Sequence, residues 1–169
     1  MSTFLPPPRV VITGHKTDGT SVFTADKTSK PFKPLGQTGT SFNSIHSSPS
    51  FPVSNTTPIR DLSTTLPKCP QNGVLFYTTD FAPYSSAPMH RTTTVDYTVI
   101  LSGEVVVQLD GGMEKVLKAG ECIVQRGTNH VWENRTGEWC RAVFVMVASK
   151  EIELADGTML VETQSNGTN

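Results

Sequence analysis

The chain has 169 residues and a formal net charge of −1, with 14 Lys and Arg against 15 Asp and Glu. This length suits one well-buried domain and is short for two. The scattered cations give no electrostatic footprint for nucleic acid or a membrane surface. No apolar run is long enough to cross a bilayer, and the N-terminus lacks the basic start and apolar core of a signal peptide. We therefore expect a cytoplasmic protein that binds neither nucleic acid nor membrane.

Residues 1–72 are dominated by Ser, Thr, Pro and Gly and are expected to form an N-terminal arm. Arg9–His15 has the β-branched composition of a strand. Asp18-Gly19 is a turn signal, and it predicts a short return strand over residues 21–24. These segments together predict a β-hairpin near the start of the chain.

The remainder of the arm carries little apolar sequence. Residues 28–57 are poor in apolar side chains and rich in Pro, Ser and Gly, which predicts a long loop. This loop either lies over the mouth of a barrel or reaches across to a second subunit, and the sequence leaves both open. Residues 61–66 give a weak helix signal.

Short β-type segments separated by glycine turns follow from residue 73 onward. They show no helical period, and regular short strands of this kind indicate an antiparallel barrel or sandwich. We expect residues 73–150 to form this barrel and residues 151–169 to form a C-terminal tail. The predicted strands are residues 74–80, 90–101, 105–109, 114–117, 122–125 and 139–148.

Three cysteines, Cys69, Cys122 and Cys140, show no metal-type spacing and cannot all pair within one chain. Cys122 and Cys140 stand in apolar strand-like sequence, so we expect small buried thiols in a reducing compartment. Neither has an adjacent base, and a cysteine nucleophile is therefore not expected.

Polar residues interrupt the apolar barrel sequence in a regular way. His90, Thr92 and Asp96 are separated by even numbers of residues, so on an extended strand they face the same side. His130 follows a glycine turn in equally apolar sequence. Buried polar groups cost free energy unless they are paired or bound to a metal, so these positions predict a functional site. Each histidine is either a ligand or acid/base group, or a core side chain bonded to a carbonyl; Asp96 is either a ligand or base, or a buried anchor.

Five further residues are predicted to line a substrate pocket beside His90, Asp96 and His130. Two of them, Tyr97 and Trp132, are more often core residues than pocket residues in such positions. Arg126 either forms a salt bridge at the rim or contacts a substrate carboxylate. Arg91 alternates outward from His90 and is expected at the surface. The five predicted pocket residues are Met89, Thr92, Tyr97, Arg126 and Trp132.

Two motifs in this region resemble those of the cupin superfamily. The first motif of that family has two histidines two residues apart, then an acid and a glycine. Its places are held here by His90, Thr92, Asp96 and Gly103. The second has two spaced glycines, a histidine and an asparagine. Its places are held here by Gly120, Gly127, His130 and Asn134.

The resemblance implies an all-β fold, a cupin jelly-roll barrel (double-stranded β-helix) of two antiparallel sheets with an N-terminal arm. It also implies a homodimer formed by arm exchange and strand pairing, which covers exposed strand edges. The chain is most similar to small stand-alone cupins of bacteria and fungi, several of which accompany natural-product pathways.

The chain departs from the family pattern at its ligands. Thr92 stands where the second histidine would be, and Asp96 stands where a glutamate would be. Gln125-Arg126 replaces a proline that is common in the second motif. The remaining set, His90, Asp96 and His130, resembles a ligand group for one divalent Zn, Fe, Mn or Ni ion, and a site without metal stays equally open.

Three functions follow from this resemblance. The first is a lyase-type enzyme of secondary metabolism, which decarboxylates, dehydrates or cyclises a polyketide-like β-keto or β-hydroxy intermediate. His90, Asp96 and His130 would act there as metal ligands or as acid/base groups. The second is a non-haem iron dioxygenase that uses the same residues, and Thr92 weighs slightly against it. The third is a non-catalytic module that binds a small molecule.

Overall fold

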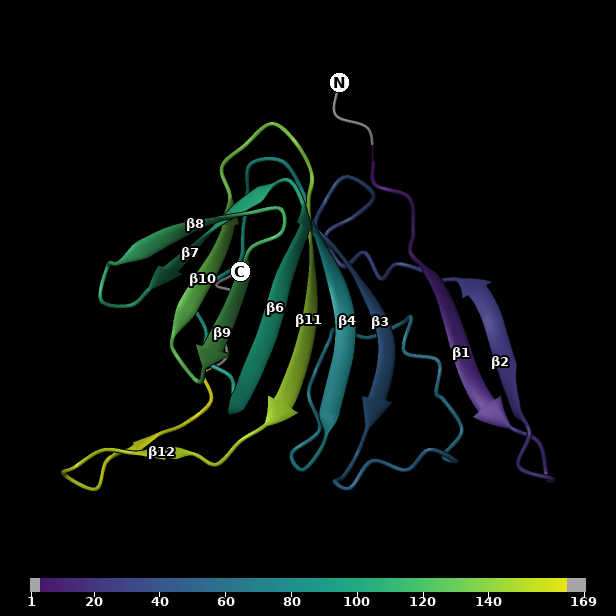
Figure 1. Ribbon diagram of the computed structural model, residues 1–169. Coiled ribbons are helices and arrows are strands. Elements are labelled where there is room, and N and C mark those ends of the chain that lie inside the picture. The colour runs from purple at the N-terminus through teal and green to yellow at the C-terminus, as the bar shows by residue number, and fades with distance from the viewer. Residues whose placement is uncertain (1–3, 164–169) are drawn as a thin grey trace.

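Two antiparallel β-sheets face each other and enclose the core of the protein (Figure 1). The computed structural model describes residues 4–163. One sheet has the strand order β5-β10-β7-β8 and the other β3-β4-β11-β6-β9, while β1-β2 and β12-β13 form separate two-stranded hairpins. The strands are β1 (Arg9–His15), β2 (Ser21–Thr28), β3 (Ser41–Ser48), β4 (Val74–Phe81), β5 (Ser85–Ser86), β6 (Thr94–Ser102), β7 (Glu104–Leu109), β8 (Glu114–Lys118), β9 (Cys122–Arg126), β10 (His130–Asn134), β11 (Cys140–Ala148), β12 (Ile152–Glu153) and β13 (Met159–Leu160). The predicted all-β barrel of two antiparallel sheets is confirmed.

Aromatic side chains from both sheets interlock between them. Trp132 of β10 stacks on Phe81 of β4, with ring centroids 5.8 Å apart. It also meets the edge of Phe144 of β11 at 5.3 Å. Tyr77 stacks on the other side of Phe144, at 4.9 Å. Aromatic pairs at such distances add to the free energy of burial, so this cluster holds the two sheets together.

In the half of the chain with regular glycine turns, most of the predicted strands are found at their predicted positions. Strands β4, β7, β8, β9 and β11 each match their predicted bounds to within one residue. Strand β6, however, begins at Thr94 instead of residue 90. His90 lies outside that strand, in an isolated antiparallel bridge with His130 of β10. The prediction that His90 and Asp96 lie on one strand is therefore wrong. His90 adjoins β10 of the four-stranded sheet, and Asp96 lies on β6 of the five-stranded sheet.

The loop predicted over residues 28–57 contains a full strand. β3 (Ser41–Ser48) pairs with β4 and forms one edge of the five-stranded sheet, so the predicted boundary at residue 72 separates it from its sheet. Its buried side chains include polar ones, Ser41 and Asn43, which gave no hydrophobic period. The weak helix predicted over residues 61–66 is also absent, because that stretch is irregular.

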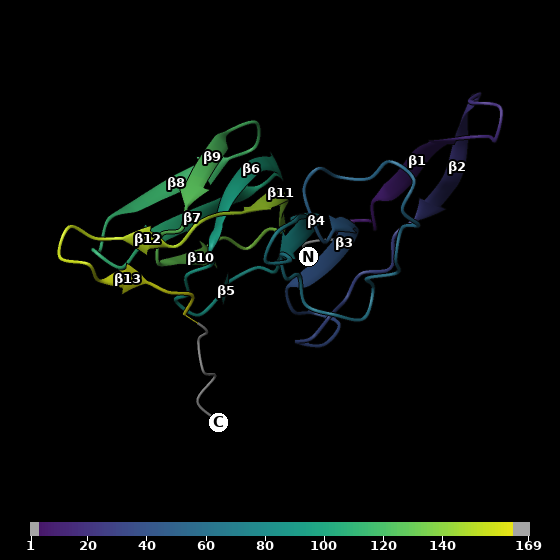
Figure 2. The same cartoon turned by 90° about the horizontal axis from the view of Figure 1, so that it is seen from below.

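The β1-β2 hairpin stands apart from the two sheets (Figure 2). Its strands pair with each other in antiparallel register, and Arg9 forms an exposed ion pair with Asp26 across them. A tie to the barrel lies just before β1, where the Arg141 guanidinium donates to the Pro6 carbonyl oxygen at 2.9 Å. Arg141 is itself held by the buried carboxylate of Asp80. An ion pair on β4 and β11 thus anchors the start of the hairpin.

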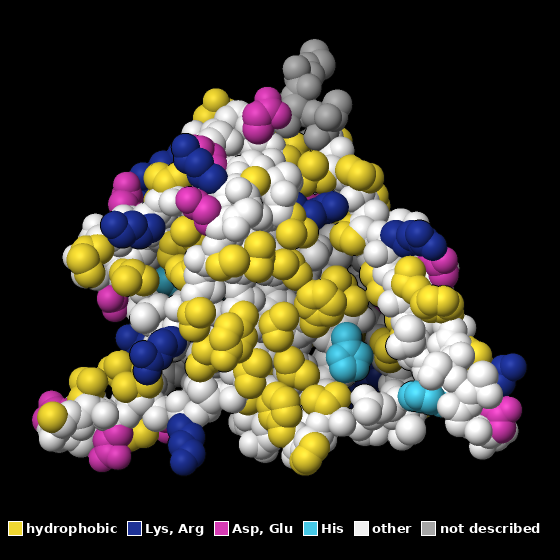
Figure 3. Space-filling model, viewed as in Figure 1, with side chains coloured by type: hydrophobic (Ala, Val, Ile, Leu, Met, Phe, Trp, Pro, Cys, Tyr) yellow, Lys and Arg dark blue, Asp and Glu magenta, His cyan; other side chains and the backbone are white. Residues whose placement is uncertain are grey.

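The outer face of the five-stranded sheet is apolar and exposed. Figure 3 shows hydrophobic side chains spread across this face, over β4, β6 and β11. Tyr97 and Leu101 of β6 are each 52% exposed, and Val124 of β9 is 56% exposed. Contiguous apolar surface of this kind usually marks a contact with another molecule.

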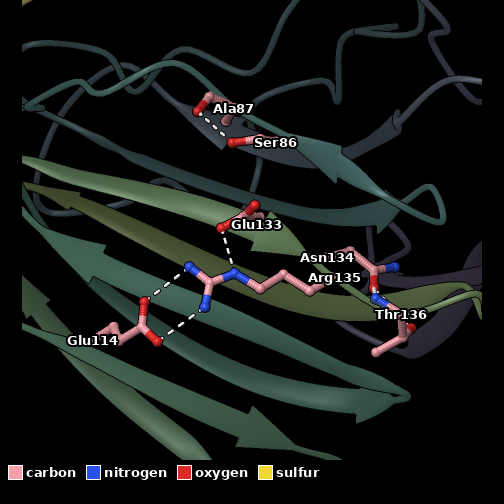
Figure 4. Close-up of polar contacts among 7 residues, drawn as sticks. All are labelled: Ser86, Ala87, Glu114, Glu133, Asn134, Arg135 and Thr136. Carbon is pink, nitrogen blue, oxygen red and sulfur yellow. Dashed lines mark hydrogen bonds and ion pairs between the residues drawn. The ribbon is translucent and has the colours of Figure 1, made fainter.

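Polar contacts across the four-stranded sheet join the end of β10 to the edge strand β8 (Figure 4). Arg135 donates two hydrogen bonds to Glu114 of β8 and one to Glu133 of β10. Asn134 is fully buried, and its amide nitrogen donates to the carbonyl oxygens of Phe81 and Glu138. The asparagine of the second motif therefore closes a turn and takes no part in a binding site.

Within residues 4–163, no helix is long and apolar enough to cross a membrane.

Candidate functional site

The two motif histidines meet between the sheets. His90 and His130 exchange both backbone hydrogen bonds, at 3.0 and 2.9 Å, and their rings lie 4.3 Å apart between centroids. His130 is buried and His90 is half-buried. Although the predicted strand over residues 90–101 begins too early, the structure does bring this predicted pair together.

Both imidazole rings are held in the same tautomer. Nδ1 of His90 lies 2.9 Å from the Pro88 carbonyl oxygen, and Nδ1 of His130 lies 2.9 Å from that of Thr128. A carbonyl oxygen only accepts hydrogen bonds, so each Nδ1 carries the hydrogen. When the rings are neutral, the lone pair of each is therefore on Nε2. Each ring can therefore accept one hydrogen bond at that atom.

Gln125 joins His130 to Asp96. Asp96 of β6 and Gln125 of β9 are register partners, and both side chains are buried. The Gln125 amide nitrogen lies 3.1 Å from Nε2 of His130 and 3.4 Å from Oδ2 of Asp96. An amide nitrogen has two hydrogens, so it can donate to both acceptors at once. The sequence analysis noted Gln125 only as the replacement for a proline; its inward position on β9 was the signal that could have identified it.

Burial sets the charge state of this trio. It lowers the pKa of His130 to about 4, with the nearby His90 acting in the same direction, so His130 is neutral at pH 7. Burial also raises the pKa of Asp96 to about 6, while the hydrogen bond from Thr94 and the charge of His90 oppose that rise. A carboxyl group of this pKa changes protonation close to neutral pH, which suits proton transfer.

Two groups that the sequence analysis did not assign to the site lie close to Asp96. Burial, followed by the charge of Asp96, raises the pKa of the Tyr77 phenol. The same two causes raise the pKa of the Cys69 thiol to about 11. The Cys69 sulfur also lies 3.5 Å from the carbonyl oxygen of Met146, the β11 register partner of Asp96. At neutral pH both groups are protonated and uncharged, so Asp96 is the acidic group of this interior.

Several buried oxygen atoms in this interior have no partner in the described part of the chain. They include Oδ1 of Asp96, Oε1 of Gln125 and Oγ1 of Thr98. A buried polar atom without a hydrogen bond costs free energy, typically about 1–3 kcal/mol. Water or a bound ligand is the usual source of the missing hydrogen bonds. These unpaired oxygens lie together with His130 and Gln125, so the interior around Asp96 offers hydrogen-bonding groups that the described residues do not use.

The predicted metal ligands do not assemble as a metal site. Within residues 4–163, no three or more His, Cys, Asp or Glu side chains gather closely enough to hold an ion. The Gln125 amide nitrogen lies between Asp96 and His130 and carries hydrogens, so it opposes a cation at that point. The arrangement suits a hydrogen-bonded acid–base group better than a ligand set.

The five predicted pocket residues separate in the structure. Thr92 and Arg126 line a pocket of about 200 Å³ at the end of the five-stranded sheet, and Met89 is half-buried beside His90. Tyr97 points to the outer face instead, and Trp132 is a core residue at 4% exposure. The Tyr97 assignment is wrong, because Tyr97 alternates with the inward-facing Asp96 on β6. Trp132 faces inward like His130, but its ring is packed between Phe81 and Phe144 in the core.

Two lesser predictions also require correction. Arg91 was expected at the surface, but its side chain is only 15% exposed and lies 3.9 Å from Asp110. Cys122 was expected to be buried, yet it is exposed on β9, at the edge of its sheet. In contrast, Cys140 is fully buried as predicted.

The cupin domain model matches residues 77–148, which span β4 to β11. A cupin-domain-containing oxidoreductase, virC of Hypocrea virens, is 31% identical over 152 residues, covering 86% of this chain and 78% of the relative. The chain belongs to the cupin family.

This cupin also resembles proteins of fungal biosynthesis clusters. Phomopsin biosynthesis cluster protein D of Diaporthe leptostromiformis is 37% identical over 161 residues, which cover 90% of this chain and 84% of the relative. Among solved structures, the polyketide cyclase RemF of Streptomyces resistomycificus superimposes with a TM-score of 0.50. It shares 18% identity and covers 72% of this chain and 75% of its own, which shows a common fold.

Proposed function

We propose that this cupin is an enzyme of fungal secondary metabolism, a lyase that removes a proton next to a carbonyl group. The relatives named for biosynthesis clusters support the setting. The observation that carries the chemistry is the Asp96 carboxyl group, with a pKa of about 6 and an unpartnered Oδ1, joined through Gln125 to His130 and accompanied by His90 with its lone pair on Nε2. The substrate class is a β-keto or β-hydroxy carbonyl compound.

The proposed step places Asp96 as the base. Its Oδ1 takes the proton from the carbon beside the carbonyl, and the C–H electron pair forms the new double bond as the β-hydroxyl leaves. The same carboxyl group then gives its proton to the departing oxygen, so one water is released and no oxidant is needed. Gln125 holds Oδ2 in place during both transfers. Nε2 of His90 accepts a hydrogen bond from the substrate hydroxyl and orients it, while Nε2 of His130 accepts from Gln125 and holds that amide in place.

Oxidoreductase chemistry is the second candidate, because four relatives are named as cupin-domain-containing oxidoreductases. That chemistry needs an electron acceptor, and molecular oxygen with a redox metal is the acceptor of the dioxygenase hypothesis. The two candidates therefore differ in two measurable requirements, oxygen and metal.

The test incubates the purified protein with a panel of β-hydroxy ketones and β-keto acids, in buffer with EDTA and without oxygen. Products are followed by mass spectrometry, and uptake of deuterium from D₂O reports proton removal. We expect turnover that Asp96→Asn lowers by roughly 100-fold or more, as for loss of a general base. The matched control is Asp26→Asn, because that carboxylate is exposed on the β1-β2 hairpin, which stands apart from the two sheets (Figure 2).

Metal analysis of the same samples separates the candidates. Activity that appears only with oxygen and a bound metal would overturn the lyase proposal in favour of the oxidoreductase. If the panel compounds bind without any turnover or deuterium uptake, both enzyme proposals fail and the non-catalytic binding function remains.

A further inference from the structure

A basic pocket lies next to the Asp96 site but is separate from it. It measures about 200 Å³ and is formed where β6 begins, where β9 ends and where the chain leaves β11. The β12-β13 hairpin contributes Ile152 and Leu160 to its wall, and His90, Asp96 and His130 do not line it. The lining residues are Arg91, Thr92, Thr93, Thr94, Val95, Arg126, Gly127, Ser149, Lys150, Glu151, Ile152 and Leu160.

Three cations line this pocket against a single carboxylate. Arg91, Arg126 and Lys150 face the charge of Glu151, which leaves a local excess of two positive charges. Within residues 4–163, neither Arg126 nor Lys150 forms an ion pair. Lys and Arg side chains gather between the end of β9 and β12 in Figure 3. The excess charge makes the pocket attractive to an anion.

Arg91 adds a second, independent observation. Its side chain is 15% exposed, and its ion-pair contact, Asp110, is 3.9 Å away. Its Nε is buried and has no hydrogen-bond partner among the described residues. A guanidinium N–H without a partner is costly, and a ligand oxyanion is the acceptor for which its planar fork is suited.

Threonine hydroxyls connect this pocket to the proposed base. The Thr94 hydroxyl lies 2.8 Å from that of Thr92 in the pocket wall. The Thr94 side chain also lies close enough to the Asp96 carboxyl group to lower its pKa. A ligand bound in the pocket is thus linked through two side chains to the group that is proposed to move the proton.

We infer that this pocket binds the carboxylate group of a small organic acid, and that the substrate of the proposed lyase carries such a group. This inference rests on the proposed function for its role in the reaction, but not for the binding itself. Apolar Val95, Ile152 and Leu160 share the wall with the cations, which suits an acid with a carbon skeleton better than inorganic phosphate.

Calorimetric titration of the full chain with malonate tests the binding, at fixed ionic strength and with inorganic phosphate as the competing probe. We expect saturable malonate binding that Arg126→Gln and Lys150→Gln each weaken about fivefold, a modest factor because both cations are exposed. Lys115→Gln on β8 is the matched control and should leave binding unchanged, since Lys115 lies outside the pocket.

Three results would overturn the inference. These are no saturable malonate binding, equal binding by all variants, or tighter binding of phosphate than of malonate. Asp96→Asn separates this inference from the proposed function, because it should keep malonate binding while losing turnover. If the protein binds malonate as expected but never turns over an organic acid, the lyase proposal fails and the pocket assignment stands.

Discussion

Strand β11 is hydrogen-bonded along both edges, to β4 and β6, and four of its side chains are buried in the barrel. Strand β1 pairs only with β2, and Val10 is the one buried side chain in that hairpin. The barrel is stabilised from within, whereas a lone two-stranded hairpin is marginal in water. The barrel can therefore hold the site in place by itself, whereas the hairpin must pack against a surface outside its own two strands to be stable.

The largest difference between the two regions is expected on removal of an aromatic ring. Trp132→Ala leaves a cavity between Phe81 and Phe144, and it should lower the free energy of unfolding by about 3–5 kcal/mol. Phe23→Ala is the matched change in the hairpin, where the ring is 76% exposed, and should change it by less than about 0.5 kcal/mol. Urea unfolding followed by fluorescence measures both, and equal losses would contradict the comparison.

A second effect within the barrel depends on pH. Burial raises the pKa of Asp96 from 3.8 to about 6, so the folded state holds this proton more tightly than the unfolded state. Stability from this group is thus fully present below about pH 4 and is lost as pH rises through about 6. A shift of two pKa units corresponds to about 3 kcal/mol at most.

Asp96→Asn tests that effect because it removes the titration. We expect it to be more stable than the wild type at pH 7.5, by about 2 kcal/mol, and close to it at pH 4. Asp110→Asn is the exposed control and should show no such difference. A gap that stays constant from pH 4 to pH 7.5 would rule out an ionised, buried Asp96.

The smallest expected effect on the unfolding free energy concerns the apolar outer face of the five-stranded sheet. We propose that a second copy of the chain covers it, since Tyr97 on that face and Phe23 on the hairpin are both exposed and both lack a partner surface in one chain. Tyr97→Lys should change the unfolding free energy by less than about 0.5 kcal/mol but convert a dimer into a monomer. Light scattering after gel filtration reports the mass. Met113→Lys is the control, because Met113 is also exposed but lies in the turn between β7 and β8, and this variant should remain dimeric. A monomeric wild type would refute the proposal.

The sequence predicted those parts of the fold in which hydrophobic alternation and glycine turns coincide. Strand β7 carries three adjacent valines before a glycine turn, and it was placed to within one residue. Strand β3 was missed because its buried side chains include Ser41 and Asn43, whose burial depends on partners far away in the chain. Local composition cannot show such pairing.

The site was predictable in its motif residues and not in the groups between them. His90, Asp96 and His130 were predicted from their places in the two motifs, and in the structure His90 lies beside His130 while Gln125 joins His130 to Asp96. Gln125 required the register between β6 and β9, and Tyr77 required the distance across the barrel. Both depend on which strands become neighbours, and that is decided by packing.

Residues 49–73, which join β3 to β4, form a long connection whose two ends are fixed together. Ser48 pairs with Val74, and the Gly73 backbone packs so closely on Ser48 that a Cβ would lie 1.9 Å from its carbonyl oxygen. With its ends held in this way, the segment can lengthen at a cost of only about 0.6 kcal/mol per doubling. Cys69 within it reaches the interior near Asp96. Insertions and deletions there would change what packs beside Asp96 without altering the pairing of either sheet.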